Sequence, residues 1–179
     1  MQVFIVISYT MKELMKMKRY YIAYGSNINM FRMKGRCPNA ELLGTATLNG
    51  WELWFKKSKT GAYLTIEENP TRSIPVVVWS ISADDEATLG RCEGFPVCYY
   101  KRRLKVKYKG ISTGKERTVH GFTYIMPEER EYGTPTDGYM NICIAGYRTF
   151  KFDRRALYEA EYKSKQMERK RRGWYIYEP

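Results

Sequence analysis

Seven short segments rich in β-branched and aromatic residues constrain the fold more than any other feature of the chain. Each segment is bounded by Gly, Pro or Asn, which favour turns. The predicted strands cover residues 20–24, 42–48, 51–57, 62–67, 75–81, 99–108 and 117–126. Because several strands follow one another without an intervening helix, their order favours an α+β fold over a doubly wound sheet. We therefore predict a compact β-barrel, mixed or mainly antiparallel, with flanking helices.

Four helices are predicted to flank this sheet, over residues 28–35, 83–93, 137–146 and 153–170. The second of them is the best marked. Ser82 can cap its N-terminus, and the acidic residues 84–86 suit the positive end of the helix dipole. We expect Gly94 to end this helix, because glycine readily adopts the left-handed conformation common at helix C-termini.

The chain has 179 residues, of which 44% are hydrophobic, so it is long and apolar enough for one domain with its own core. We predict a domain over residues 18–165, preceded by an N-terminal extension (1–17) and followed by a basic C-terminal tail (166–179). The extension contains "VFIVI", which is too short to span a bilayer and lacks the flanks of a signal peptide. We interpret it either as an edge strand or as a segment upstream of the natural start.

The formal net charge of +12 indicates an acidic partner, which could be a small molecule, a nucleic acid or an anionic surface. Toward the C-terminus, "KSKQMERKRRGWYIYEP" (163–179) sets aromatic residues beside basic ones, a combination that can hold single-stranded nucleic acid. The sequence has no RRM, KH or helix-turn-helix pattern, however, so a nucleic-acid-binding function is disfavoured. No membrane association is predicted.

Cysteine and histidine usage argues against a metal site. The four cysteines fall at irregular spacings without a CxxC pair, and His120 is the sole histidine. A Ser-His or Cys-His nucleophile would need His120, which lies in the strand-like "TVHGFTYIM" and is interpreted as a packed residue. We therefore predict no metal and no cofactor. The cysteines demand no disulfide, which fits the cytoplasm.

An early strand ends abruptly at Tyr24-Gly25-Ser26-Asn27, and this tetrapeptide has two interpretations. Ser and Asn are ordinary helix caps, so the residues could simply start the next helix. Alternatively, they form an anion-binding loop, because Gly25 lets a ligand approach the backbone and consecutive N–H groups at a helix N-terminus attract negative charge. The tetrapeptide alone does not decide between the two.

Glu93, in "RCEGFPVCYY", is predicted to be the last residue of the helix over 83–93. A carboxylate there meets the negative end of the helix dipole, which is mildly unfavourable. A carboxyl group that exchanges its proton near neutral pH can act as a general acid and base. The alternative is an ordinary surface glutamate in front of a glycine that ends the helix.

The segment "YKRRLKVKYK", residues 100–109, alternates between two faces. Lysine dominates one face, which we expect to be solvated. The other face is expected to be buried; it carries Tyr100, Arg102, Leu104, Val106 and Tyr108. Arg102 would then be an inward-pointing cation that needs a carboxylate, either from the protein or from a ligand. We therefore include Arg102 among the candidate ligand-binding residues.

Taken together, the early YGSN, "VVVWSIS", the acidic helix, "EGFPVCYYKR" and the later "GFTYIM" resemble the γ-glutamylcyclotransferase-like, or AIG2-like, superfamily. The resemblance covers residues 21–147. "CPNAELLGTATLNGW" and "SKTGAYLTIEE" are similar to the bacterial branch of that group. The tetrapeptide YGSN differs from the YGSL that is typical of the glutathione-specific branch.

The resemblance implies a barrel-like fold with a cavity, in which Glu93 is the catalytic residue. It further implies that the loop from Tyr24 to Asn27 holds the γ-glutamyl end of a small-molecule substrate. Tyr100 matches a tyrosine of the family's site, and Tyr124 and Tyr139 are weaker matches.

The reaction implied by the resemblance is attack of the substrate's α-amine on its own γ-carbonyl carbon. This attack gives 5-oxoproline and releases the amine, and it needs no cofactor. One alternative is a binding protein of the same fold that lacks catalysis, because a fold does not fix a function. The basic nucleic-acid-binding protein remains a further alternative with less support.

Overall fold

The computed structural model describes residues 18–171 and 173. Its strands are β1 (Arg19–Ala23), β2 (Glu41–Ser58), β3 (Gly61–Ile81), β4 (Tyr100–Gly110) and β5 (Glu116–Ile125). Its helical elements are a 3₁₀ turn, η1 (Ser26–Ile28), and four α-helices, α2 (Met30–Arg36), α3 (Ala83–Glu93), α4 (Asp137–Thr149) and α5 (Arg155–Arg171). The predicted N-terminal extension lies outside the described residues. So do residues 172 and 174–179 of the predicted tail.

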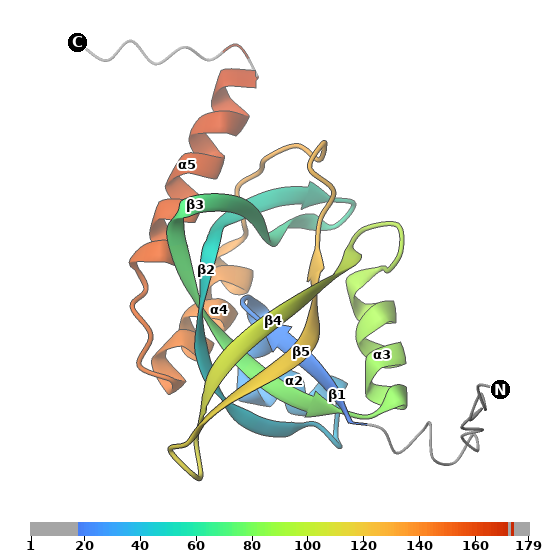
Figure 1. Cartoon of the computed structure of the whole chain (residues 1–179). Coiled ribbons are helices and arrows are strands. Elements are labelled where there is room, and N and C mark those ends of the chain that lie inside the picture. Colours follow the sequence, from blue (N-terminus) through green and yellow to red (C-terminus); the bar gives the residue numbers. More distant parts are fainter. Residues whose placement is uncertain (1–17, 172, 174–179) are drawn as a thin grey trace, which may run out of the picture.

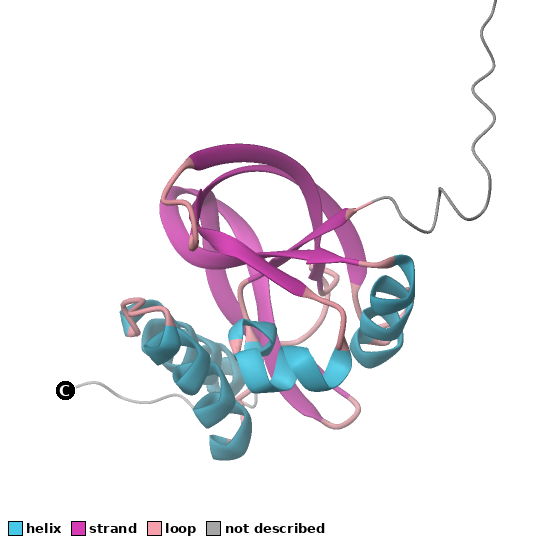
Figure 2. Ribbon diagram, turned by 90° about the horizontal axis from the view of Figure 1, so that it is seen from below, coloured by secondary structure: helices cyan, strands magenta, loops and turns pink. Residues whose placement is uncertain are grey.

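The strands form a closed barrel in the order β1-β3-β2-β4-β5. Neighbouring strands run antiparallel, except that β1 and β5 run parallel where Tyr21 pairs with Phe122. Figure 2 shows the ring of strands, with helices below it and toward its left and right. The predicted α+β fold with a mainly antiparallel barrel is therefore confirmed.

The hairpin of β2 and β3 supplies more than half of the strand residues and bends midway. Its register shifts between Asn49 and Trp51, where Gly50 adopts a φ of +82°. The sequence predicts strand ends at this point and near Pro70. That prediction was wrong, because the chain turns at a bulge and continues pairing instead of leaving the sheet.

Closure of the barrel between β2 and β4 depends on a short seam. In the described part of the chain these strands pair only at Gly44↔Gly110 and Thr45↔Lys109. A Cβ atom at Gly44 would lie 2.1 Å from the carbonyl oxygen of Lys109, so only glycine permits this approach. The seam therefore rests on the absence of a side chain at Gly44.

Within the described residues the first half of β4 pairs with β5 alone, and most of its side chains are exposed. Val106 and Tyr108 are buried as predicted, whereas Tyr100 is exposed. Arg102 is also exposed, and its guanidinium forms an ion pair with Glu68 at 2.7 Å. The prediction that Tyr100 and Arg102 lie on a buried face was therefore wrong, because the barrel encloses only the second half of this strand.

Helices cover the barrel on several sides, and α3 and α5 lie at opposite sides of it in Figure 1. The backbone N–H of Phe55 in β2 donates to the Ser164 hydroxyl in α5 at 2.9 Å, which fixes α5 against the sheet. The hydrophobic core joins the strands to these helices; it includes Ile22, Phe55, Ile74, Val76, Val78, Leu89, Cys143, Tyr147 and Leu157. No helix within residues 18–171 combines the length and the apolar character needed to cross a bilayer.

Candidate functional site

The YGSN loop is held between the barrel and α4. Tyr24 follows β1 and is buried, and its hydroxyl donates to the carbonyl of Tyr124 at 2.6 Å. The Tyr147 hydroxyl in α4 donates to the carbonyl of Tyr24 at 3.2 Å. Ser26 and Asn27 are buried in the turn η1 that follows. The tetrapeptide is therefore fixed from both sides and packed inside the protein.

Glu93 is placed by the way α3 begins and ends. Ser82 and Asp85 form a reciprocal capping box at the N-terminus of α3. Gly94 ends the helix in the left-handed conformation, with φ +63°, and its N–H donates to the carbonyls of Gly90 and Arg91. Both helix ends lie where the sequence predicts them, and Glu93 is the last helical residue.

The carboxylate of Glu93 is held by one of its two oxygens. The Asn27 side-chain amide donates to Glu93 Oε1 at 3.1 Å, and Arg36 Nη1 donates to the same oxygen at 2.9 Å. Arg36 Nη1 also donates to Asn27 Oδ1 at 2.9 Å, so the three side chains form a closed network. No described residue donates a hydrogen bond to Oε2. The network therefore fixes the carboxylate and leaves one oxygen available.

The Glu93–Arg36 ion pair is largely shielded from water. The side chains are 15% and 19% exposed, respectively. Arg36 compensates the negative charge of the ionised carboxylate in a place where an unpaired charge would be costly. The Asn27 amide continues the network inward, where it donates to the Tyr21 hydroxyl at 2.8 Å.

A pocket in two parts surrounds this network. The inner chamber has a volume of about 20 Å³, close to the space of one water molecule, and is lined by the YGSN loop with Glu93, Tyr21, Leu64, Tyr99, Tyr124 and Tyr139. The outer chamber has a volume of about 300 Å³, at the lower end of small-molecule sites. Ser26, Glu93, Tyr99 and Tyr139 line both chambers, so the two adjoin at the carboxylate.

The tyrosines around the inner chamber are neutral hydrogen-bonding groups. Burial raises the pKa of Tyr21, Tyr24, Tyr99 and Tyr139 well above the ordinary value for a phenol. The Tyr99 hydroxyl donates to the carbonyl of Leu64 at 3.1 Å, and the Leu64 N–H donates to the Tyr139 hydroxyl at 3.3 Å. These phenols keep their protons at neutral pH and give the chamber a polar wall without charge.

The structure brings most of the predicted site residues together. Tyr24, Gly25, Ser26 and Asn27, with Glu93, Tyr124 and Tyr139, all line the inner chamber. Tyr100 and Arg102 line neither chamber and point to solvent. Tyr99 is 6% exposed and occupies the site instead of its neighbour Tyr100.

Two residues of the network, Tyr21 and Arg36, are absent from the prediction. Tyr21 lies in a strand that reads as uniformly apolar, so its hydroxyl gives no separate signal. Arg36 lies in the last turn of α2, where basic residues are common because they suit the helix dipole. Only the packing of α2 beside α3 shows that Arg36 reaches Glu93.

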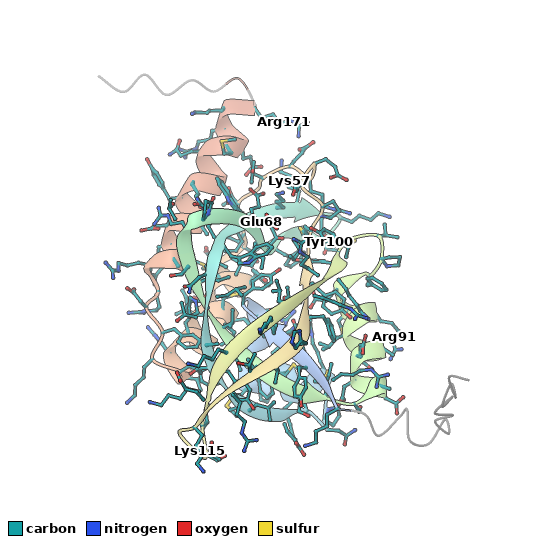
Figure 3. The ribbon with its side chains drawn as sticks, viewed as in Figure 1. Lys57, Glu68, Arg91, Tyr100, Lys115 and Arg171 are labelled. Atoms are coloured by element: carbon teal, nitrogen blue, oxygen red, sulfur yellow. The ribbon has the colours of Figure 1, made fainter. Side chains whose placement is uncertain are left out.

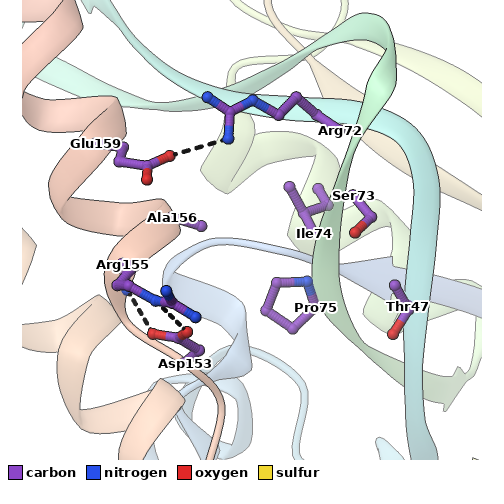
Figure 4. A pocket seen from close by; sticks show the side chains of 9 residues that line it. All are labelled: Thr47, Arg72, Ser73, Ile74, Pro75, Asp153, Arg155, Ala156 and Glu159. Atoms are coloured by element: carbon purple, nitrogen blue, oxygen red, sulfur yellow. Dashed lines mark hydrogen bonds and ion pairs between the residues drawn. The ribbon is translucent and has the colours of Figure 1, made fainter.

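His120 and the hollow between β3 and α5 lie apart from this site. His120 is exposed on β5, so the prediction of a packed histidine was wrong. A hollow of about 430 Å³ between β3 and α5 is shown in Figure 4. There the Arg72 guanidinium pairs with Glu159 and Arg155 pairs with Asp153, so its cations are already compensated.

If Glu93 is the catalytic residue that the resemblance implies, changing Arg36→Gln is expected to lower kcat by about ten- to a hundredfold, because it removes the charged hydrogen bond that fixes Glu93 Oε1. KM should change little if Arg36 acts through Glu93, and Arg36→Lys should restore part of the activity. Steady-state kinetics on the purified variants give this comparison. A rise in KM with an unchanged kcat would instead assign Arg36 to substrate binding.

Comparison with known proteins identifies a matching family and several related folds. The model of the family "Gamma-glutamyl cyclotransferase, AIG2-like" matches residues 21–141, more than half of the chain. Among solved structures, the chain is similar to a γ-glutamyl cyclotransferase, with a TM-score of 0.65 and 26% identity, covering 83% of this chain and 86% of that one.

Two further solved structures share the fold. The uncharacterized protein loc79017 from Homo sapiens has a TM-score of 0.61 and 28% identity, covering 74% of this chain and 79% of that one. YkqA from Bacillus subtilis has a TM-score of 0.63 and 20% identity, covering 78% of this chain and 51% of that one. No curated protein sequence matches the chain. The family match over residues 21–141 shows that this chain belongs to the AIG2-like γ-glutamyl cyclotransferase family.

Proposed function

We propose that the protein cyclises the γ-glutamyl group of a γ-glutamyl amine or peptide to 5-oxoproline and releases the amine, with Glu93 as general acid and base. One observation carries the proposal. Glu93 Oε1 is held by Asn27 and Arg36, whereas Oε2 receives no hydrogen bond from a described residue, and the carboxylate lines both chambers. A fixed carboxylate with one available oxygen suits proton transfer to and from a bound amine.

The reaction begins with the substrate's α-ammonium group beside Glu93. The inner chamber accommodates a group of this size, and Oε2 accepts one proton from it. The freed amine attacks the γ-carbonyl carbon of the same substrate, and a new C–N bond closes a five-membered ring. Because both reacting groups belong to one molecule, holding the substrate in a folded conformation supplies much of the rate enhancement.

Collapse of the tetrahedral intermediate completes the reaction. Protonated Glu93 gives its proton to the departing nitrogen, and the original C–N bond breaks. Glu93 then moves the surplus proton of the new ring nitrogen to the released amine, so the products are 5-oxoproline and an ammonium ion. Glu93 ends as a carboxylate, so no other reactant is consumed. The developing oxyanion needs hydrogen-bond donors, and the backbone N–H groups of the loop are the proposed source.

Gly25 leaves room for the substrate beside the loop. A Cβ atom there would lie 3.4 Å from the Leu64 Cβ and 3.5 Å from the Tyr139 hydroxyl, ordinary contact distances. The fold alone therefore does not require glycine for reasons of space. A side chain would instead take up part of a chamber of about 20 Å³.

A substrate screen tests the proposed function. The purified protein would be incubated with a panel of γ-glutamyl amino acids and γ-glutamyl amines, and 5-oxoproline would be measured by mass spectrometry. We expect 5-oxoproline and the free amine in equal amounts from at least one compound. Binding of these compounds without turnover would instead favour a catalytically silent binding protein of the same fold.

Two narrower assignments accompany the proposal. We place the chain in the bacterial branch of the family because of the similarity of "CPNAELLGTATLNGW" and "SKTGAYLTIEE" to that branch. We also place the reaction in the cytoplasm, in keeping with four cysteines that are free in the structure.

A further inference from the structure

Three cations border the outer chamber without a carboxylate partner among the described residues. They are Arg32 of α2, Lys59 of the turn between β2 and β3, and Arg91 in the last turn of α3. None of them takes part in an ion pair with a described residue. The three elements thus converge on one chamber with unpaired positive charge.

Arg32 and Arg91 have unused hydrogen-bonding capacity. Arg32 Nε is buried and has no acceptor in the structure. Arg91 Nη2 donates to the Thr88 hydroxyl at 2.9 Å, a neutral partner that leaves the charge of the guanidinium uncompensated. Buried donors are usually hydrogen-bonded, so Arg32 Nε is free to donate to an acceptor on a bound molecule.

The charge of the outer chamber is therefore strongly positive. Its lining includes four cationic side chains and the single carboxylate of Glu93, and Arg36 is already paired with that carboxylate. Arg32, Lys59 and Arg91 remain. The hollow in Figure 4 differs, because its two arginines each pair with a carboxylate of the protein. A concave site lined by unpaired cations concentrates anions.

On the basis of the proposed function, we infer that the amine released by this enzyme is itself acidic: an amino acid with a side-chain carboxylate as well as an α-carboxylate, such as glutamate or aspartate. The inner chamber has a volume of about 20 Å³ and adjoins Glu93, so it takes the reacting α-amine of the substrate. The departing part of the substrate must then lie in the outer chamber, among Arg32, Lys59 and Arg91. Guanidinium groups bind carboxylates through strong, charge-assisted hydrogen bonds.

The test compares γ-glutamyl-glutamate with γ-glutamyl-glutamine, which has nearly the same shape but one carboxylate fewer. We expect the KM of γ-glutamyl-glutamate to be about tenfold lower, since a hydrogen bond between charged groups contributes more than a neutral one. Rising salt should weaken this preference, because the interacting charges are partly exposed to solvent.

Arg91→Gln should reduce the roughly tenfold preference for γ-glutamyl-glutamate to about threefold, because it removes one of the three cations. Lys115→Gln removes the same charge from the turn between β4 and β5, far from Arg91 in Figure 3, and should leave the preference as it is. Equal KM values for the two substrates, or an equal loss of preference in both variants, would overturn the inference while the proposed function stands.

Failure of the proposed function would be recognised separately, as an absence of 5-oxoproline from every γ-glutamyl compound. Calorimetric binding of the same two compounds to the Glu93→Gln protein then decides the inference. Tighter binding of γ-glutamyl-glutamate supports an acidic ligand in the outer chamber. Equal binding of the two compounds, or no binding of either, rules it out.

Discussion

Changing Glu93→Gln is expected to lower kcat/KM by roughly a hundred- to ten-thousandfold, which is the usual contribution of general acid–base catalysis. Glutamine keeps the size of the side chain and can still accept hydrogen bonds from Asn27 and Arg36 through its carbonyl oxygen. It cannot take a proton from the substrate's α-ammonium group. The variant should remain folded, and its activity is measured as the rate of 5-oxoproline formation.

Glu68→Gln is the matched control for this experiment. It makes the same chemical change in an exposed ion pair with Arg102, and Glu68 lines neither chamber of the pocket. We expect activity within about twofold of the unchanged protein, since exposed ion pairs contribute little. Near-normal turnover by Glu93→Gln, or a loss of activity as large in Glu68→Gln, would remove the basis for the assignment of Glu93.

Changing Gly44→Ala is expected to destabilise the protein by about 3 kcal/mol or more, because overpacking against a rigid neighbour is costly. The new Cβ atom would lie 2.1 Å from the carbonyl oxygen of Lys109, so β2 and β4 would have to separate. Their pairing at Gly44 and Thr45 closes the barrel. For a domain of this size, a loss of about 3 kcal/mol lowers Tm by roughly 6–12 °C.

Gly35→Ala provides the comparison, because a Cβ at that position would have no atom within 4 Å apart from its chain neighbours and the backbone of its own helix. Gly35 is exposed in α2, where alanine is the better helix former, so Tm should stay the same or rise slightly. Thermal unfolding followed by circular dichroism measures both variants. An unchanged Tm in Gly44→Ala would mean that closure of the barrel does not depend on the seam.

Short sequence signals predicted two parts of the site: the ends of the helix that carries Glu93, and the point where the first strand gives way to the YGSN loop. Ser82 and Gly94 mark the ends of α3, and these ends set the position of Glu93. The change from an apolar strand to Gly25-Ser26-Asn27 likewise marks the end of β1 and the start of η1. Both features depend on residues next to one another in the chain, which is why sequence reasoning could locate them.

The residues that were missed or misplaced depend on long-range packing. The alternation in "YKRRLKVKYK" gives two faces but does not tell where the barrel stops enclosing the strand, so Tyr100 and Arg102 were placed inside. Tyr99 precedes the strand, and its inward position follows from the contact with Leu64 in β3. Arg36 reaches Glu93 across 57 positions of the chain, and no local pattern records that contact.

The central claim is that the substrate's own amine, and not water, attacks the γ-carbonyl carbon. The most direct test is to run the reaction of a free-amine γ-glutamyl substrate in ¹⁸O-labelled water and to identify the primary product by mass spectrometry. Acetylating the α-amine should abolish turnover, although the added bulk could also block binding, so the product is the decisive readout. We predict 5-oxoproline without ¹⁸O, because water takes no part in the ring closure. Glutamate carrying ¹⁸O as the primary product would show hydrolysis and contradict the mechanism assigned to Glu93.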